Sequence, residues 1–126
     1  MTENEITEKI IGAAIEVHKT LGGPGCIESI YEEALCYEMK NFGLEYQRQV
    51  ACPIYYKNVE LGHPLKIDLL VENRIIVECK AAIENNPIFA AQCLTYLRLT
   101  QNRIGLVLNF GLKYMNQGIE RVINGY

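Results

Sequence analysis

Two carboxylates and one lysine lie inside two hydrophobic runs near the middle of the chain. Asp68 belongs to the run Ile67–Val71, and Glu78 and Lys80 belong to the run Ile75–Lys80. A buried charge is unfavourable unless it is paired or binds a metal ion. Carboxylates are ligands of Mg²⁺, and an amine beside them can neutralise charge that develops on a phosphate. The three residues therefore predict a divalent-metal site that acts on a phosphate ester.

The loop between the two runs decides whether the acids meet. Side chains alternate across a strand, and directly opposed Cβ atoms are about 5 Å apart. If residues 72–74 form a three-residue loop, Val71 pairs with Ile75 and Asp68 lies opposite Glu78. A two-residue turn would shift the register by one and place the acids on opposite faces. We expect the three-residue loop. The alternative is a structural salt bridge between Lys80 and one of the acids.

Two predicted helices add polar residues to this set. Glu28 and Tyr31 are three residues apart at the start of one helix, so they share a face. An acid in a first helical turn also complements the helix dipole, which is the structural alternative for Glu28. Gln92 and Tyr96 are four apart in a later helix that is apolar nearly all round, so we expect that helix to be buried. A buried Gln92 would bond to backbone or hold a water or a phosphate at the site.

The remaining pattern predicts a single domain over residues 1–126 with an α/β fold of mixed type. Expected helices cover residues 5–20, 27–41 and 87–99, and expected strands cover 45–56, 59–61, 65–71, 75–80, 103–110 and 118–123. Lys57-Asn58 is expected to form a hairpin turn. The order α-α-β-β-β-β-α-β-β predicts a central mixed β-sheet flanked by helices.

Composition limits the functional classes. The net charge is −3, with −6 over residues 1–45 and +3 over residues 46–126, which excludes a strongly basic coat protein of DNA. No apolar run reaches the roughly 18 residues that a membrane-spanning helix needs. The N-terminus is acidic and lacks the basic region of a secretory signal, so we expect a cytoplasmic protein. Five widely spaced cysteines without a C-x-x-C pair predict free thiols, not a zinc site or disulfides.

Several segments together resemble a known family. Gly25–Tyr31 is similar to the signature of the GxxExxY proteins, a group within the PD-(D/E)XK nuclease superfamily. The resemblance spans roughly residues 5–123 and continues through Tyr55–Lys57, Lys66–Val71, Val77–Lys80 and Asn109–Gly111. One departure is Ile67, which stands where the superfamily motif has proline and where the proline has no chemical role.

The resemblance implies a restriction-endonuclease-like core with a site that depends on Mg²⁺ or Mn²⁺. It implies Asp68 and Glu78 as metal ligands and Lys80 as the catalytic lysine. Glu28 corresponds to an early-helix acid that joins the metal site in the RecB-like branch. Gln92 and Tyr96 match a Gln-X-X-X-Tyr motif that lies beside the site in the same branch, and Tyr31 is expected to support it.

The implied function is hydrolysis of phosphodiester bonds in nucleic acid, with DNA favoured over RNA. The alternative is a non-catalytic module that keeps the nuclease fold and binds nucleic acid or a partner protein. Because the chain is close to a minimal core, specificity is expected to come from a homodimer or a protein partner.

Overall fold

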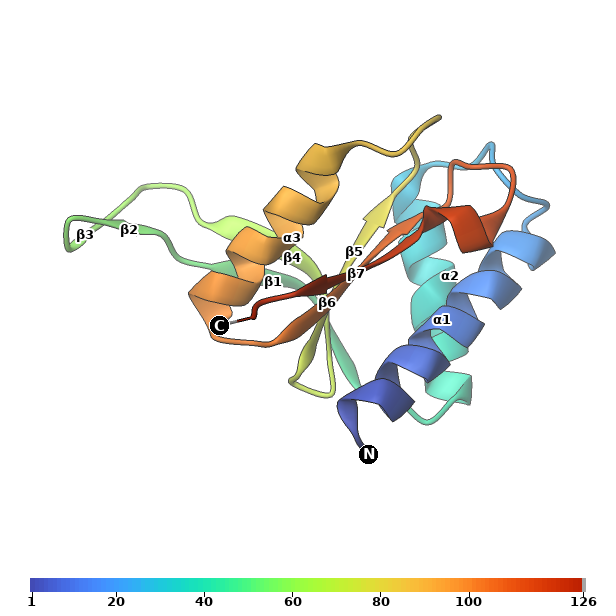
Figure 1. Ribbon diagram of the computed structural model, residues 1–126, viewed down its shortest axis with the longest axis horizontal. Coiled ribbons are helices and arrows are strands. Elements are labelled where there is room, and N and C mark those ends of the chain that lie inside the picture. The colour runs from blue at the N-terminus through green and yellow to red at the C-terminus, as the bar shows by residue number, and fades with distance from the viewer. Residues whose placement is uncertain (126) are drawn as a thin grey trace.

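The computed structural model describes residues 1–125 and contains three long helices and seven strands (Figure 1). Their bounds are α1 Glu3–Thr20, α2 Glu28–Asn41, β1 Tyr46–Cys52, β2 Tyr55–Tyr56, β3 Val59–Glu60, β4 Leu65–Val71, β5 Ile75–Lys80, α3 Pro87–Thr100, β6 Ile104–Asn109 and β7 Ile119–Ile123, with a short 3-10 helix, η1, at Met115–Gly118. The predicted α/β mixed fold is confirmed. One difference is that the expected strand 45–56 is two strands, because Pro53 has no amide to donate to the ladder.

The central sheet has five strands in the order β1-β4-β5-β6-β7. The pair β5–β6 is parallel and is joined through α3, whereas the other three pairs are antiparallel. A parallel pair requires such a crossover, so α3 fixes β6 beside β5. The sheet is therefore mixed, as the sequence predicts, and β5 occupies its centre.

Helices cover both faces of the sheet, with α1 and α2 on one face and α3 on the other (Figure 1). The core on the α1–α2 face includes Ile10, Leu35, Leu69, Val77 and Leu106. The core on the α3 face includes Ile76, Cys93, Leu97 and Val107. Every residue of β6 is buried, and β5 is buried up to Lys80. Burial on both faces explains why these strands have nearly continuous apolar sequences.

The capping residues explain where two of the helices begin. Thr2 forms a capping box with Glu5 before α1. Asn86 accepts a hydrogen bond from the Ile88 amide, and Pro87 occupies the first turn of α3. The expectation that α3 is buried is wrong, because only Cys93 and Leu97 are buried, while Ile88 and Leu99 are 52% and 43% exposed. This helix lies on the sheet with one narrow apolar face.

A separate hairpin of β2 and β3 projects from the body of the molecule (Figure 1). Tyr56 pairs with Val59, and the two intervening residues Lys57 and Asn58 have φ of 50° and 68°. Positive φ at both central residues is typical of the tight hairpin turn, so the predicted turn is confirmed. Within residues 1–125, no helix combines the length and apolar character needed to cross a bilayer.

Candidate active site between the central strands

The turn between β4 and β5 sets the register that the site needs. Val71 pairs with Ile75, and the pairing continues to Leu69 and Val77. Glu72, Asn73 and Arg74 form the intervening loop, and the Arg74 amide donates to the Val71 carbonyl at 3.0 Å. The expected three-residue loop is confirmed. The next positions in this register are Asp68 and Glu78.

The two acids exchange hydrogen bonds with the backbone of the opposite strand. The Asp68 amide donates to Glu78 Oε1 at 3.3 Å, and the Cys79 amide donates to Asp68 Oδ2 at 2.9 Å. Each carboxylate thus replaces a backbone acceptor where the β4–β5 ladder stops. The acids lie side by side at the point where these two strands separate.

Burial and repulsion dominate the electrostatics of Glu78. The residue is 4% exposed, and burial raises the pKa of its carboxyl to about 9. The charge of Asp68 adds to this increase, and Lys80 partly opposes it. In residues 1–125, the salt bridges are Arg48–Glu32 and Arg103–Glu3, so the salt-bridge alternative for Asp68, Glu78 and Lys80 is not observed. Two adjacent acidic side chains that form no salt bridge offer the oxygen ligands that a hard divalent cation prefers.

Lys80 ends β5 on the same side of the sheet as Glu78. Its Nζ donates to Gln92 Oε1 at 3.0 Å and lies 5.0 Å from the centre of the Phe89 ring. Gln92 is exposed, which corrects the expectation that it is buried. Tyr96 is half-buried one turn further along α3, and its pKa is raised by desolvation and then by the charges of Glu78 and Asp68. The face of α3 that contains Gln92 and Tyr96 therefore borders the acids.

Glu28 approaches from the other side, in the first turn of α2. Its side chain is exposed in part, but partial desolvation of the carboxyl raises its pKa. The charge of Asp68 raises this pKa further, and the charge of Lys80 lowers it. Tyr31 is fully buried and stacks on Phe110 with ring centres 4.7 Å apart. Its hydroxyl donates to the Gly23 carbonyl at 2.7 Å and accepts from the Cys26 amide at 3.1 Å. Tyr31 thus holds the loop that precedes Glu28.

Glu32 lies beside Asp68, although it is not among the site residues that the sequence predicts. Ligand atoms of Glu32, Asp68 and Cys79 all lie within 4.8 Å of one another, whereas the sequence predicts the set Asp68, Glu78 and Glu28. Only Asp68 is common to both sets. Burial raises the pKa of the Cys79 thiol well above 9, so it stays protonated and is a poor ligand for a hard cation. The one signal for Glu32 in the sequence is its position four residues after Glu28, on the same helix face.

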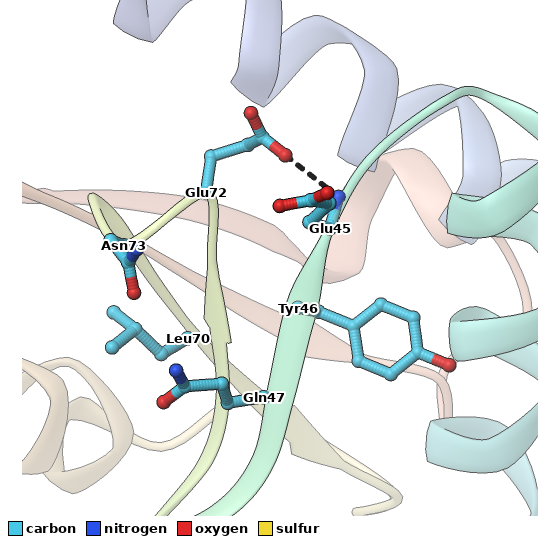
Figure 2. A pocket seen from close by; sticks show the side chains of 6 residues that line it. All are labelled: Glu45, Tyr46, Gln47, Leu70, Glu72 and Asn73. Carbon is cyan, nitrogen blue, oxygen red and sulfur yellow. Dashed lines mark hydrogen bonds between the residues drawn. The ribbon is translucent and has the colours of Figure 1, made fainter.

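A shallow pocket opens at the other end of β5. Figure 2 shows its lining, which consists of Glu45, Tyr46, Gln47, Leu70, Glu72 and Asn73. Two of these residues are joined, because the Glu72 carboxylate accepts a hydrogen bond from the Glu45 amide at 2.7 Å (Figure 2). None of the predicted site residues lines this pocket. It belongs to the β4–β5 turn, away from Lys80.

Comparison with known proteins agrees with this architecture. A sequence model described as the PD-(D/E)XK nuclease superfamily matches residues 4–122, which is nearly the whole chain. No curated protein and no solved structure matches significantly. The match covers nearly the whole chain, and the five-stranded mixed sheet between helices agrees with it. The chain belongs to the PD-(D/E)XK nuclease superfamily.

Proposed function

We propose that the protein is a metal-dependent nuclease that hydrolyses phosphodiester bonds, with DNA favoured over RNA, using Asp68, Glu78 and Lys80. The observation that carries the proposal is the pair of acids where β4 and β5 separate, each of which accepts a hydrogen bond from a backbone amide of the opposite strand. Lys80 follows Glu78 on the same face of β5. Membership of the superfamily supports a nucleic acid as the substrate.

The donor set suits Mg²⁺ or Mn²⁺, which prefer oxygen ligands. Asp68 and Glu78 would hold the ion, with Glu28 as a third carboxylate from α2. The elevated pKa of Glu78 supports this assignment. Burial of the charge and repulsion by Asp68 both favour the protonated carboxyl, and a bound cation would offset both effects. When bound, such an ion polarises a phosphoryl oxygen and lowers the pKa of a coordinated water.

The remaining residues act on the substrate through charge and position. The Lys80 ammonium neutralises negative charge that develops on the phosphate, and Gln92 orients it through the 3.0 Å bond. Tyr96, on α3, borders Asp68 and Glu78, and Tyr31 fixes the loop before Glu28. The resemblance of Gly25–Tyr31 to the GxxExxY group supports Glu28 as part of the site. Five free thiols fit a cytoplasmic, reducing compartment.

The direct test is cleavage of single- and double-stranded DNA and RNA with Mg²⁺, Mn²⁺ or EDTA. Asp68→Ala, Glu78→Ala and Lys80→Ala should each lower the cleavage rate by about 100-fold or more, because each removes a charge that acts in the transition state. Glu33→Ala and Lys113→Ala, at exposed positions, serve as controls. Circular dichroism shows whether each variant is folded. Activity that persists in all three site variants would sink the proposal.

The second candidate is a binding module without catalysis. The acidic character of residues 1–45 and the small net charge of −3 favour it. It predicts a gel shift that survives EDTA and no cleavage with either metal. The same assay therefore separates the two functions.

A further inference from the structure

The ladder between β1 and β4 is interrupted at Asp68. Arg48 pairs with Leu69 and Val50 pairs with Ile67, but the intervening positions, Gln49 and Asp68, do not pair. Gln49 has φ of 51°, in the left-handed region that a side chain rarely adopts in a strand. The β4–β5 pairing also stops one position before Asp68. Asp68 is thus the one β4 residue without a ladder partner on either side.

The side chains of β1 and β4 change from one face of the sheet to the other at this interruption. Leu69 and Val71 pack in the core under α1 and α2, whereas Ile67 packs in the core under α3. Regular alternation would place Ile67 and Leu69 on one face. In β1, Tyr46 and Val50 divide between the two cores in the same way. The change of face leaves Asp68 at the boundary between the two helical layers.

Glu32, on α2, binds the two β1 residues that lie at the interruption, Arg48 and Gln49. It is 5% exposed, and its carboxylate accepts bonds from Arg48 Nε at 3.1 Å and Arg48 Nη2 at 3.0 Å. Gln49 Nε2 donates to both carboxylate oxygens, at 3.1 and 3.3 Å. The side chain of the residue with the unusual φ is therefore tied to a buried anion. A ligand atom of Glu32 also lies within 4.8 Å of one of Asp68.

We propose that Glu32 is a positioning residue: by binding Gln49 and Arg48, it keeps β1 turned away from Asp68 so that the Asp68 carboxylate faces Glu78 and the Cys79 amide. Its consequence for ion binding rests on the proposed function. The geometry itself does not, because it follows from the contacts that Glu32 makes with Arg48 and Gln49. Glu32 does not need to touch substrate or metal in this role.

The test on metal-free protein is hydrogen exchange of the Cys79 amide, which donates to Asp68 Oδ2. Glu32→Gln keeps the side-chain size but replaces one acceptor oxygen with a donor, and Gln49→Leu removes the donor without changing any acid. In both variants the Cys79 amide should exchange its hydrogen at least about tenfold faster than in the wild type. The Leu106 amide in the core should exchange at the wild-type rate. Glu33→Gln, at an exposed position of the same helix, is the control. Cys79 exchange within about twofold of wild type in both variants overturns the proposal.

Binding of Mn²⁺, measured by calorimetry, tests the consequence. Both variants should weaken binding by about tenfold or more, as for other groups that orient a ligand. The double variant should bind Mn²⁺ no more weakly than Glu32→Gln alone, since Gln49 acts through its contact with Glu32. Weakening by Glu32→Gln alone would make Glu32 a direct ligand and overturn the positioning role. If wild-type protein binds no Mn²⁺ and cleaves nothing, the proposed function fails, while the exchange rates still decide the role of Glu32.

Discussion

The Glu78 carboxyl group combines deep burial with a second acid beside it. Both effects favour its protonated form, and the resulting pKa of about 9 lies far above the ordinary 4.5. Between these values the folded chain binds one more proton than the unfolded chain. The contribution of Glu78 to stability is therefore greatest below about pH 4.5 and is lost as the pH rises toward 9. Glu78 favours binding of a cation at the expense of the stability of the metal-free protein.

Glu78→Gln should remove this pH dependence. In the metal-free wild type, the free energy of unfolding should fall by up to about 1.4 kcal/mol per pH unit within the window, relative to the variant. Glutamine keeps the hydrogen bond from Asp68 without a titrating proton. Urea denaturation at about pH 6 and about pH 8 measures the difference. Parallel pH profiles for the two proteins would contradict the account of Glu78.

Ion binding should show the opposite dependence on pH. Because Glu78 must lose its proton to act as a ligand, Mg²⁺ affinity should rise up to about tenfold per pH unit until the pH reaches about 9. Calorimetry in buffers with different ionisation enthalpies should detect the release of close to one proton per ion near neutral pH. Affinity that does not change with pH would show that Glu78 is not a ligand.

Tyr31 tests the support of the loop before Glu28. Tyr31→Phe keeps the stack on Phe110 but leaves the Gly23 carbonyl and the Cys26 amide without the hydroxyl. We expect a loss of about 1–3 kcal/mol in the free energy of unfolding by urea. Tyr37→Phe is the control, since Tyr37 is 68% exposed, and it should change stability little. Equal stability of Tyr31→Phe and the wild type would remove Tyr31 from the loop's support.

At the level of elements, sequence patterns predicted most of the scaffold for physical reasons that the structure makes clear. The continuous apolar runs of β5 and β6 arise because both faces are buried, and the odd loop length fixes the register of Asp68 and Glu78. The exposure of α3 could not be predicted, because Ile88 and Leu99 look like core residues in the sequence. Glu32 could not be predicted because its partners, Arg48 and Gln49, are distant in sequence and meet it only in the folded chain.

The packing of α3 on β6 depends on Gly105. A Cβ atom there would lie 2.5 Å from Cys93 Sγ and 3.1 Å from the Ile76 carbonyl oxygen. Gly105→Ala should therefore destabilise the protein by about 1–3 kcal/mol, measured by urea denaturation. The loss should be smaller in a Cys93→Ala background, where the sulfur is absent.

Gly12→Ala provides a control of opposite sign. Gly12 lies within α1, and an added Cβ would be 3.7 Å from the Phe42 ring, which is an ordinary contact. Alanine there should stabilise the protein by about 0.5–1 kcal/mol. If Gly105→Ala were as well tolerated as Gly12→Ala, α3 would not pack closely on β6.

At the level of the whole molecule, three helices pack on the five-stranded sheet, and the β2–β3 hairpin is a separate two-stranded sheet. Tyr55, Tyr56 and Val59 are 62–63% exposed, and Cys52 lies directly opposite Leu65 at the base of the hairpin. Residues 53–64 can therefore be replaced with an Asn-Gly turn. The free energy of unfolding should change by about 1 kcal/mol or less, because the hairpin adds little to the core. Loss of cooperative thermal unfolding would show that the hairpin is integral to the fold.

Binding of a divalent cation by Asp68 and Glu78, where β4 and β5 separate, can be followed residue by residue. The measurement is a titration of the protein with Mg²⁺, observed by NMR of the backbone amides. The largest chemical-shift changes should occur at the amides of Asp68, Glu78 and Cys79, with a smaller change at Glu28. Shifts concentrated at Glu45 and Glu72 around the distant pocket, or no change at Asp68 and Glu78, would show that these two acids are not the ligands.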